Sequence, residues 1–194
     1  MQKLTRKDLY SLEEYTEMRD DFRKKIIAHK EDRRLELGEN VLMMFEDRLI
    51  MQYQVQEMLK AEKIFEAEGI EEELGAYNPL IPDGTNWKAT MLIQYTDVEE
   101  RQQKLSQLIG IENTIWMQVE GFDKVFAIAD EDLERDTEEK TSAVHFMRYE
   151  LDNDMITAVK TGAAISAGVE HENYQAIINP IVSNIRDSLA SDLD

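Results

Sequence analysis

Cysteine is absent from this chain of 194 residues. Disulfides, thiolate zinc sites, iron–sulfur clusters held by this chain alone and cysteine nucleophiles are therefore excluded. A bound metal ion would need aspartate, glutamate or histidine ligands, and histidine occurs only 3 times. The chain also lacks a glycine-rich phosphate loop and a Gly-x-Ser-x-Gly elbow. No motif assigns a reaction by itself.

Long hydrophobic runs are lacking too. No apolar stretch approaches the roughly 18 residues that a membrane span needs, and the opening residues MQKLTRKDLY show no charged-then-apolar leader. We therefore expect a soluble, cytoplasmic protein. The length favours one domain over residues 1–194, with a helical portion at 1–70 and a sheet-plus-helix portion at 71–194.

Positive charge is scarce, because 22 Lys and Arg face 41 Asp and Glu for a net charge of -19. Nucleic acids and anionic membranes are polyanions, so neither is expected as a partner. The charge is uneven: residues 1–36 hold 10 of the basic and 9 of the acidic side chains, which leaves 12 basic and 32 acidic ones for the rest. Internal pairing with the acidic body and binding of an external anion both account for this basic strip.

A helical face dominates the first 37 residues. Ser11 and Glu14 form a capping-box pattern. Beyond it, side chains recur at steps of three and four residues, which is one face of a helix: Leu12, Tyr15, Arg19, Phe22, Ile26, His29, Arg33 and Leu37. Gly38 fits a left-handed helix end and Asn40 a cap, so a second helix over about 40–68 should run antiparallel to the first.

Sheet signals follow the turn-rich segment 77–84. Alternation and turn residues predict strands over 88–95, 114–119, 124–129, 142–151 and 164–169, with helices over 98–109 and 152–160. A C-terminal helix is expected over 174–193, in which Pro180 causes either a kink or a delayed start. The charge-dense segment 130–140 is interpreted as a solvated loop. The predicted fold class is α+β: a long N-terminal antiparallel helical hairpin packed on a mainly antiparallel sheet of about five strands, with short helices and a C-terminal helix.

Polar residues on the predicted seams are the candidate site. The arginines of the first helix would face Gln56 and Glu57, either as a semi-buried network or as a pocket for a phosphate or carboxylate ligand. The candidate ligand-binding residues are Arg19, Arg23, His29, Arg33, Gln56, Glu57, His145 and Arg148. His145 has a second interpretation as a core histidine bonded to the backbone.

A metal site is the alternative for some of the same residues. A di-iron carboxylate bundle is excluded, because no His has a Glu three residues before it. A different site made of Glu46, Glu57 and His145 stays open and would hold iron or manganese.

Several separated strings resemble one bacterial family. They are Phe45-Glu46-Asp47-Arg48, Gln54-Val55-Gln56-Glu57-Met58-Leu59, Tyr77-Asn78-Pro79-Leu80-Ile81-Pro82, Ser142-Ala143-Val144-His145-Phe146 and Val169-Glu170-His171. In order and spacing they are similar to the domain of unknown function 3501 (DUF3501), over nearly the whole chain. The resemblance implies no activity, but members tend to be encoded beside rubrerythrin-like and iron–sulfur oxidoreductase-like proteins, which implies a redox or iron-handling context.

Two functional hypotheses follow. The first is a cytoplasmic accessory protein that is not an enzyme and docks on a rubrerythrin-like or iron–sulfur oxidoreductase-like partner through an exposed apolar or methionine-rich patch, with a homodimer also open. The second is a small-molecule- or metal-binding enzyme with an Arg/Glu/His pocket between the helical hairpin and the sheet.

Overall fold

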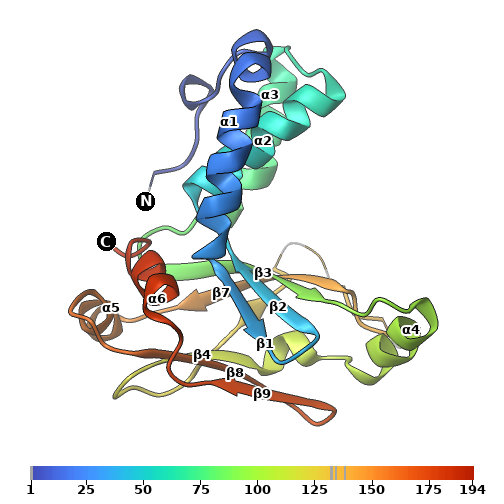
Figure 1. Ribbon diagram of the computed structural model, residues 1–194, viewed down its shortest axis with the longest axis vertical. Coiled ribbons are helices and arrows are strands. Elements are labelled where there is room, and N and C mark those ends of the chain that lie inside the picture. The colour runs from blue at the N-terminus through green and yellow to red at the C-terminus, as the bar shows by residue number, and fades with distance from the viewer. Residues whose placement is uncertain (1, 132, 134, 138) are drawn as a thin grey trace.

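The computed structural model describes residues 2–194 except 132, 134 and 138 (Figure 1). Its α-helices are α1 (Leu12–Glu31), α2 (Arg48–Glu62), α3 (Ala67–Tyr77), α4 (Val98–Gln107), α5 (Asn153–Lys160) and α6 (Ser183–Ala190). Its strands are β1 (Arg34–Leu37), β2 (Val41–Phe45), β3 (Asn86–Ile93), β4 (Ile115–Val119), β5 (Val125–Phe126), β6 (Ile128–Ala129), β7 (Val144–Glu150), β8 (Ile165–His171) and β9 (Tyr174–Ile178). Short 3-10 helices are η1 (Arg6–Asp8), η2 (Asn78–Leu80) and η3 (Ile111–Thr114).

The strands form two antiparallel sheets that enclose the main core. The first sheet has the order β1-β2-β3-β7-β6 and the second β5-β4-β8-β9. Alternate residues of strands from both sheets, such as Met91 and Met147 on one and Met117 and Ala167 on the other, belong to a single buried cluster. Helices α4 and α5 close opposite ends of this sandwich (Figure 1). The fold is α+β, with two sheets where the sequence predicted one of about five strands.

The predicted long helical hairpin is wrong. Helix α1 ends at Glu31, and a β-hairpin of β1 and β2 stands between α1 and α2. Leu35 and Leu37 alternate with exposed neighbours, and the run 41–45 pairs with β3 from Val41 opposite Ile93 to Phe45 opposite Ala89. An internal strand has both faces covered, so its continuous apolar run mimics a buried helix. Gly38 has the positive φ of 74° that was expected, but in the turn of this hairpin.

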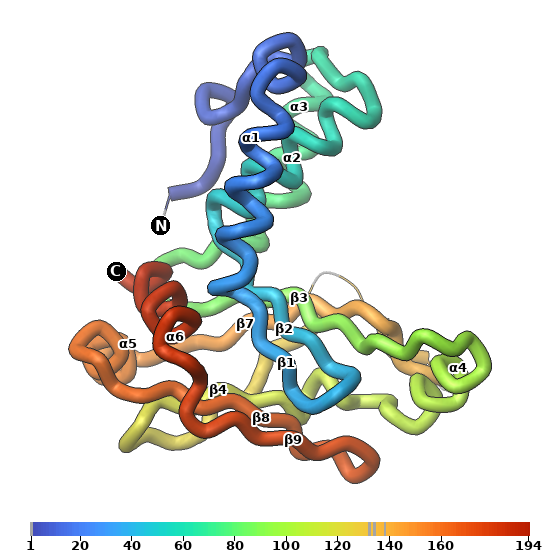
Figure 2. The backbone as a smooth tube through the Cα atoms, viewed as in Figure 1, coloured from blue at the N-terminus to red at the C-terminus, as the bar shows by residue number. Residues whose placement is uncertain are grey.

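Helices α1, α2 and α3 form a layer of their own that rises from one face of the sandwich (Figures 1 and 2). Their apolar residues form clusters separate from the main core. In one of these, Phe22 meets Tyr15 and Tyr53 edge to face, with ring centroids 6.2 Å and 5.7 Å away, an arrangement that aromatic quadrupoles favour. The helices are thus spread along the chain, and three of them pack mainly on one another.

The C-terminal prediction is also corrected. Residues 174–178 are strand β9, and after a cis Asn179–Pro180 bond the chain enters α6. Proline has no N–H for a helix interior, and Tyr174 to Ile178 pair with β8. Helix α6 lies against the sandwich, where Leu189 O accepts a bond from Trp87 Nε1 at 3.0 Å. No helix in the described part of the chain is long and apolar enough to cross a membrane.

Candidate metal centre

The arginine of the first helix that was predicted to face Glu57 does so. Arg19 donates to both carboxylate oxygens of Glu57 at 2.7 Å each, and Tyr15 Oη donates to the same carboxylate at 2.6 Å. These donors, with Arg19 first among them, lower the pKa of Glu57 to about 2. Gln56 is buried and bonds the backbone of Tyr10 instead. The pairing satisfies both partners, which is the geometry of a structural network rather than of an open pocket.

Arg33 occupies the junction between the helical layer and the sandwich. Its guanidinium is 1% exposed and donates to Asp192 at 2.5 Å, to Ser188 Oγ at 3.1 Å, and to the carbonyls of residues 45 and 46 at 3.0 Å each. Asp47 lies 3.4 Å from Arg33 and 2.5 Å from His29 Nε2. Burial raises the pKa of Asp192 to about 6, against the opposing effect of Arg33. His29 and Arg33 therefore share one partner.

The remaining candidates lie in different surroundings. Glu46 is buried beside Thr90, which donates to it at 2.6 Å. Arg148 pairs with Glu131 at 2.8 Å and also contacts Glu150. Arg23 is exposed on α1. Glu46, Glu57 and His145 thus have three separate sets of partners, and the structure does not bring these three together.

His145 lies on the inner face of β7, as the alternation with Met147 and Tyr149 predicted, and is fully buried. Its Nδ1 is 2.6 Å from Asp130 Oδ2. Its Nε2 is 2.9 Å from Thr141 Oγ1 and 3.0 Å from the Ser142 carbonyl oxygen. Asp130 is held in place, because its Oδ1 accepts the backbone N–H of Phe146 at 3.0 Å. A carboxylate on one ring nitrogen orients the other toward a ligand, as in carboxylate–histidine–metal sites.

Two more carboxylates lie beside the imidazole. Ligand atoms of Glu112 and Asp136 lie within 4.8 Å of one another and of a ring nitrogen of His145. Asp136 accepts bonds from the backbone N–H of Gly110 at 2.8 Å and from the hydroxyl of Thr141. Glu112 lies in η3 and is 7% exposed. Its Oε2 is buried and has no hydrogen-bond partner among the described residues.

The surroundings of Glu112 disfavour the ionised form of its carboxyl group. Burial raises the pKa of Glu112, and the nearby carboxylates of Asp136 and Asp130 raise it further, while His145 opposes the shift. A carboxylate oxygen without a donor inside a protein costs roughly 1–3 kcal/mol. A cavity of about 400 Å³ opens onto this group and is also lined by Asp130, Arg135 and Asp136. The cluster therefore lies beside space that is accessible to solvent.

Hydrogen-bond acceptors outnumber protons around His145. A neutral imidazole has one N–H, yet Nδ1 faces a carboxylate oxygen and Nε2 faces a carbonyl oxygen. The one hydroxyl proton of Thr141 goes to Asp136 and is not free for Nε2. One ring nitrogen would thus face only lone pairs. A metal ion at Nε2 would resolve this conflict, because it binds the lone pair of that nitrogen.

The sequence pattern predicts only His145 as a site residue of this cluster. His145 was a candidate, whereas Glu112, Asp130 and Asp136 were not, and segment 130–140 was interpreted as a solvated loop. The available signal was the placement of two aspartates just before a strand that carries an inward histidine.

Comparisons with known proteins give a family and a fold. A family model described as "Protein of unknown function (DUF3501)" matches residues 3–193. A crystal structure at 1.90 Å of a novel protein of unknown function from Burkholderia pseudomallei K96243 is 46% identical, with 100% of both chains covered and a TM-score of 0.94. No curated protein matches the chain.

Proposed function

This chain belongs to the DUF3501 family of proteins of unknown function, and we propose that it binds one divalent metal ion through Glu112, Asp136 and His145. The observation that carries the proposal is the buried Oε2 of Glu112, which has no donor among the described residues and lies in a group whose ligand atoms are within 4.8 Å of one another. A cation at this point would give Glu112 Oε2 a partner and offset the repulsion between the carboxylates of Glu112 and Asp136.

The donor set favours iron or manganese in the +2 state. Carboxylate oxygens suit Mg²⁺, Ca²⁺ and Mn²⁺, and an imidazole nitrogen favours transition metals such as iron and zinc. With one His, two carboxylates and no cysteine in the chain, Mn²⁺ and Fe²⁺ satisfy both preferences. Asp130 would hold the imidazole through Nδ1, and Nε2, which lies 2.9 Å from Thr141 Oγ1, is the nitrogen that would bind the metal. We propose that the protein acts in the redox or iron-handling context that the family resemblance implies, and that it does so in the cytoplasm.

The test compares metal affinity between two matched variants. Glu112→Gln removes one ligand charge while keeping the side-chain shape, and Glu139→Gln removes an exposed carboxylate from the neighbouring segment 130–140. Isothermal titration with Mn²⁺ and anaerobic Fe²⁺ is expected to show a loss of about 100-fold or more for E112Q, since even residues behind the ligands contribute about 10–100-fold. E139Q is expected to bind like the unchanged protein. Equal affinity for all three proteins would overturn the proposal.

A docking role is a second candidate, favoured by the outer face of the second sheet. Phe126, Trp116, Gly168 and Ile177 are opposite one another in register across β5, β4, β8 and β9. They face away from the core, since their neighbours along β4 and β8 are core residues. Phe126 is 46% and Ile177 is 65% exposed, whereas Trp116 between them is 2% exposed, so Phe126 and Ile177 form the accessible part of this apolar stripe. We propose that this apolar stripe contacts the rubrerythrin-like or iron–sulfur oxidoreductase-like partner.

Purified partners provide the test of the docking role. The double variant Phe126→Ser/Ile177→Ser changes only exposed side chains, so the fold should be retained. Binding of either candidate partner, measured by biolayer interferometry, should weaken about tenfold or more, because hot-spot apolar residues contribute about 1–2 kcal/mol each. The proposal fails if neither partner binds the unchanged protein, or if the variant binds as tightly.

A further inference from the structure

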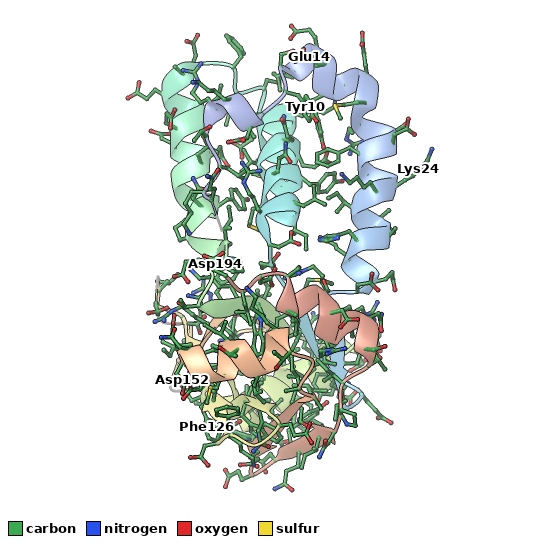
Figure 3. The ribbon with its side chains drawn as sticks, turned by 90° about the vertical axis from the view of Figure 1, so that its left-hand side faces the viewer. Tyr10, Glu14, Lys24, Phe126, Asp152 and Asp194 are labelled. Atoms are coloured by element: carbon green, nitrogen blue, oxygen red, sulfur yellow. The ribbon has the colours of Figure 1, made fainter. Side chains whose placement is uncertain are left out.

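A large cavity lies at the tip of the helical layer, at the end away from the sandwich. Figure 3 shows Tyr10, one of its lining residues, at this end of the layer. The cavity has a volume of about 710 Å³ and lies between η1 with the start of α1 on one side and the turn from α2 to α3 on the other. This volume falls within the roughly 300–1,000 Å³ of small-molecule sites.

The interior of this tip cavity is apolar. Leu59 on α2 is 2% exposed and forms part of a buried cluster, and Leu9, Leu12, Ile64 and Ile70 pack around that cluster. Phe65, which also lines the cavity, is 71% exposed and is not among the residues packed on the cluster. An exposed phenyl ring beside an apolar cavity loses contact with water when an apolar ligand enters, which favours binding.

Two cations line the same cavity. Arg6 and Lys7 are exposed on η1, and within the described part of the chain neither side chain has a hydrogen bond or an ion pair. One acid, Glu13, lines the cavity with them. Basic side chains thus outnumber acidic ones here, although the chain as a whole carries a net charge of -19.

We propose that the tip cavity binds an amphiphilic anion: an apolar chain of medium length that ends in a carboxylate. The apolar chain would enter between Leu59, Ile64 and Phe65, and the carboxylate would lie at Arg6 and Lys7. This ligand matches both features of the cavity. An uncharged apolar molecule would leave the cations without a partner, and a small anion would leave the apolar surface exposed to water. The site lies in the helical layer and is separate from the metal centre on β7.

Calorimetric titration with three probes tests the proposal. Octanoate carries both features, 1-octanol lacks the charge and acetate lacks the chain. Octanoate should bind at least about tenfold more tightly than either of the other two, because each feature contributes on the order of one tenfold step. Similar affinities for octanoate and 1-octanol would overturn the assignment of the cations.

Variants locate the site. Arg6→Gln/Lys7→Gln should weaken octanoate binding about tenfold and leave 1-octanol unchanged, whereas Phe65→Ala should weaken both about fivefold. The control Lys24→Gln/Lys25→Gln removes two exposed cations of α1 that do not line the cavity, and its affinity should equal that of the unchanged protein. Equal losses in the control would refute the site. If the protein co-sediments with phosphatidylglycerol vesicles but does not bind octanoate, the ligand is a membrane surface, and the proposed small-molecule site is refuted.

Discussion

Gly168 and Trp116 are directly paired on β8 and β4, and this pair gives the sharpest stability prediction. A methyl group added at Gly168 would be 2.5 Å from Trp116 Cζ2 and 2.9 Å from the backbone oxygen of Ala176. Trp116 is 2% exposed, so the indole has little room to move. Gly168→Ala must therefore displace a buried ring or part of the neighbouring strand β9.

The expected cost follows from two opposing effects. Overpacking of a full interior costs about 1–3 kcal/mol and occasionally more, and contacts of 2.5 Å and 2.9 Å at both a ring and a backbone atom favour the upper part of that range. Removing the flexibility of glycine returns about 0.5–1 kcal/mol. The net destabilisation is about 2 kcal/mol, or a melting temperature lower by about 4–8 °C for a chain of this size.

Gly75→Ala is the matched control. Gly75 lies in α3, and a methyl group there would meet nothing within 4 Å. The same chemical change should therefore stabilise the protein by about 0.5–1 kcal/mol through helix propensity alone. Urea unfolding followed by fluorescence measures both variants. A Gly168→Ala protein as stable as the unchanged one would refute the packing argument, and so would equal effects of the two substitutions.

Three further predictions concern charged residues. Asp47 caps α2 by accepting a hydrogen bond from Ile50 N at 2.8 Å, and it is also the shared partner of His29 and Arg33. Asp47→Ala removes both interactions, so the free energy of unfolding, measured with urea, should fall by about 2–4 kcal/mol. The pKa of Glu57 is about 2 in the folded protein and 4.5 ordinarily, so its contribution is present above pH 4.5 and is lost as the pH falls toward 2; after discounting for solvent screening it is about 1 kcal/mol. Glu57→Gln should remove this loss of stability between pH 4.5 and 2, measured as the melting temperature at each pH. An unchanged pH dependence would contradict the assignment. Glu112→Gln should stabilise the metal-free protein by about 1–2 kcal/mol, because a neutral amide removes the buried charge that Asp136 and Asp130 repel; a lower melting temperature in chelator would disprove this.

Short-range signals predicted several elements correctly. The capping box of Ser11 and Glu14 is present, and Asp97 caps α4 through Glu100 N at 2.8 Å. The turn at Gly121, with φ of 87°, separates β4 and β5, which pair, although the predicted strand 124–129 divides into β5 on the second sheet and β6 on the first. Each of these features depends on residues within a few positions of one another, so the local sequence is sufficient to specify it.

The β1–β2 hairpin could not be predicted in the same way. Leu35 and Leu37 fit a strand, yet Arg33 and Leu37 also fit the face of the preceding helix. The choice depends on β3, which starts at Asn86 and pairs with β2 along its whole length. Backbone pairing with a distant segment outweighs a local preference of a few tenths of a kcal/mol per residue.

The amino-acid composition already limits the chemistry that is open to this protein and the side chains that could carry it. Without cysteine, any side-chain metal ligands have to be aspartate, glutamate or histidine, and alternation along 144–150 is enough to place His145 facing inward. Long-range packing, by contrast, is what brings Glu112, Asp130 and Asp136 to this histidine. They come from η3 and from a segment so rich in charge that solvation is the ordinary expectation. Their convergence depends on β6, which precedes Asp130, pairs with β7 and packs on η3, because contacts between segments distant in sequence follow from the fold as a whole.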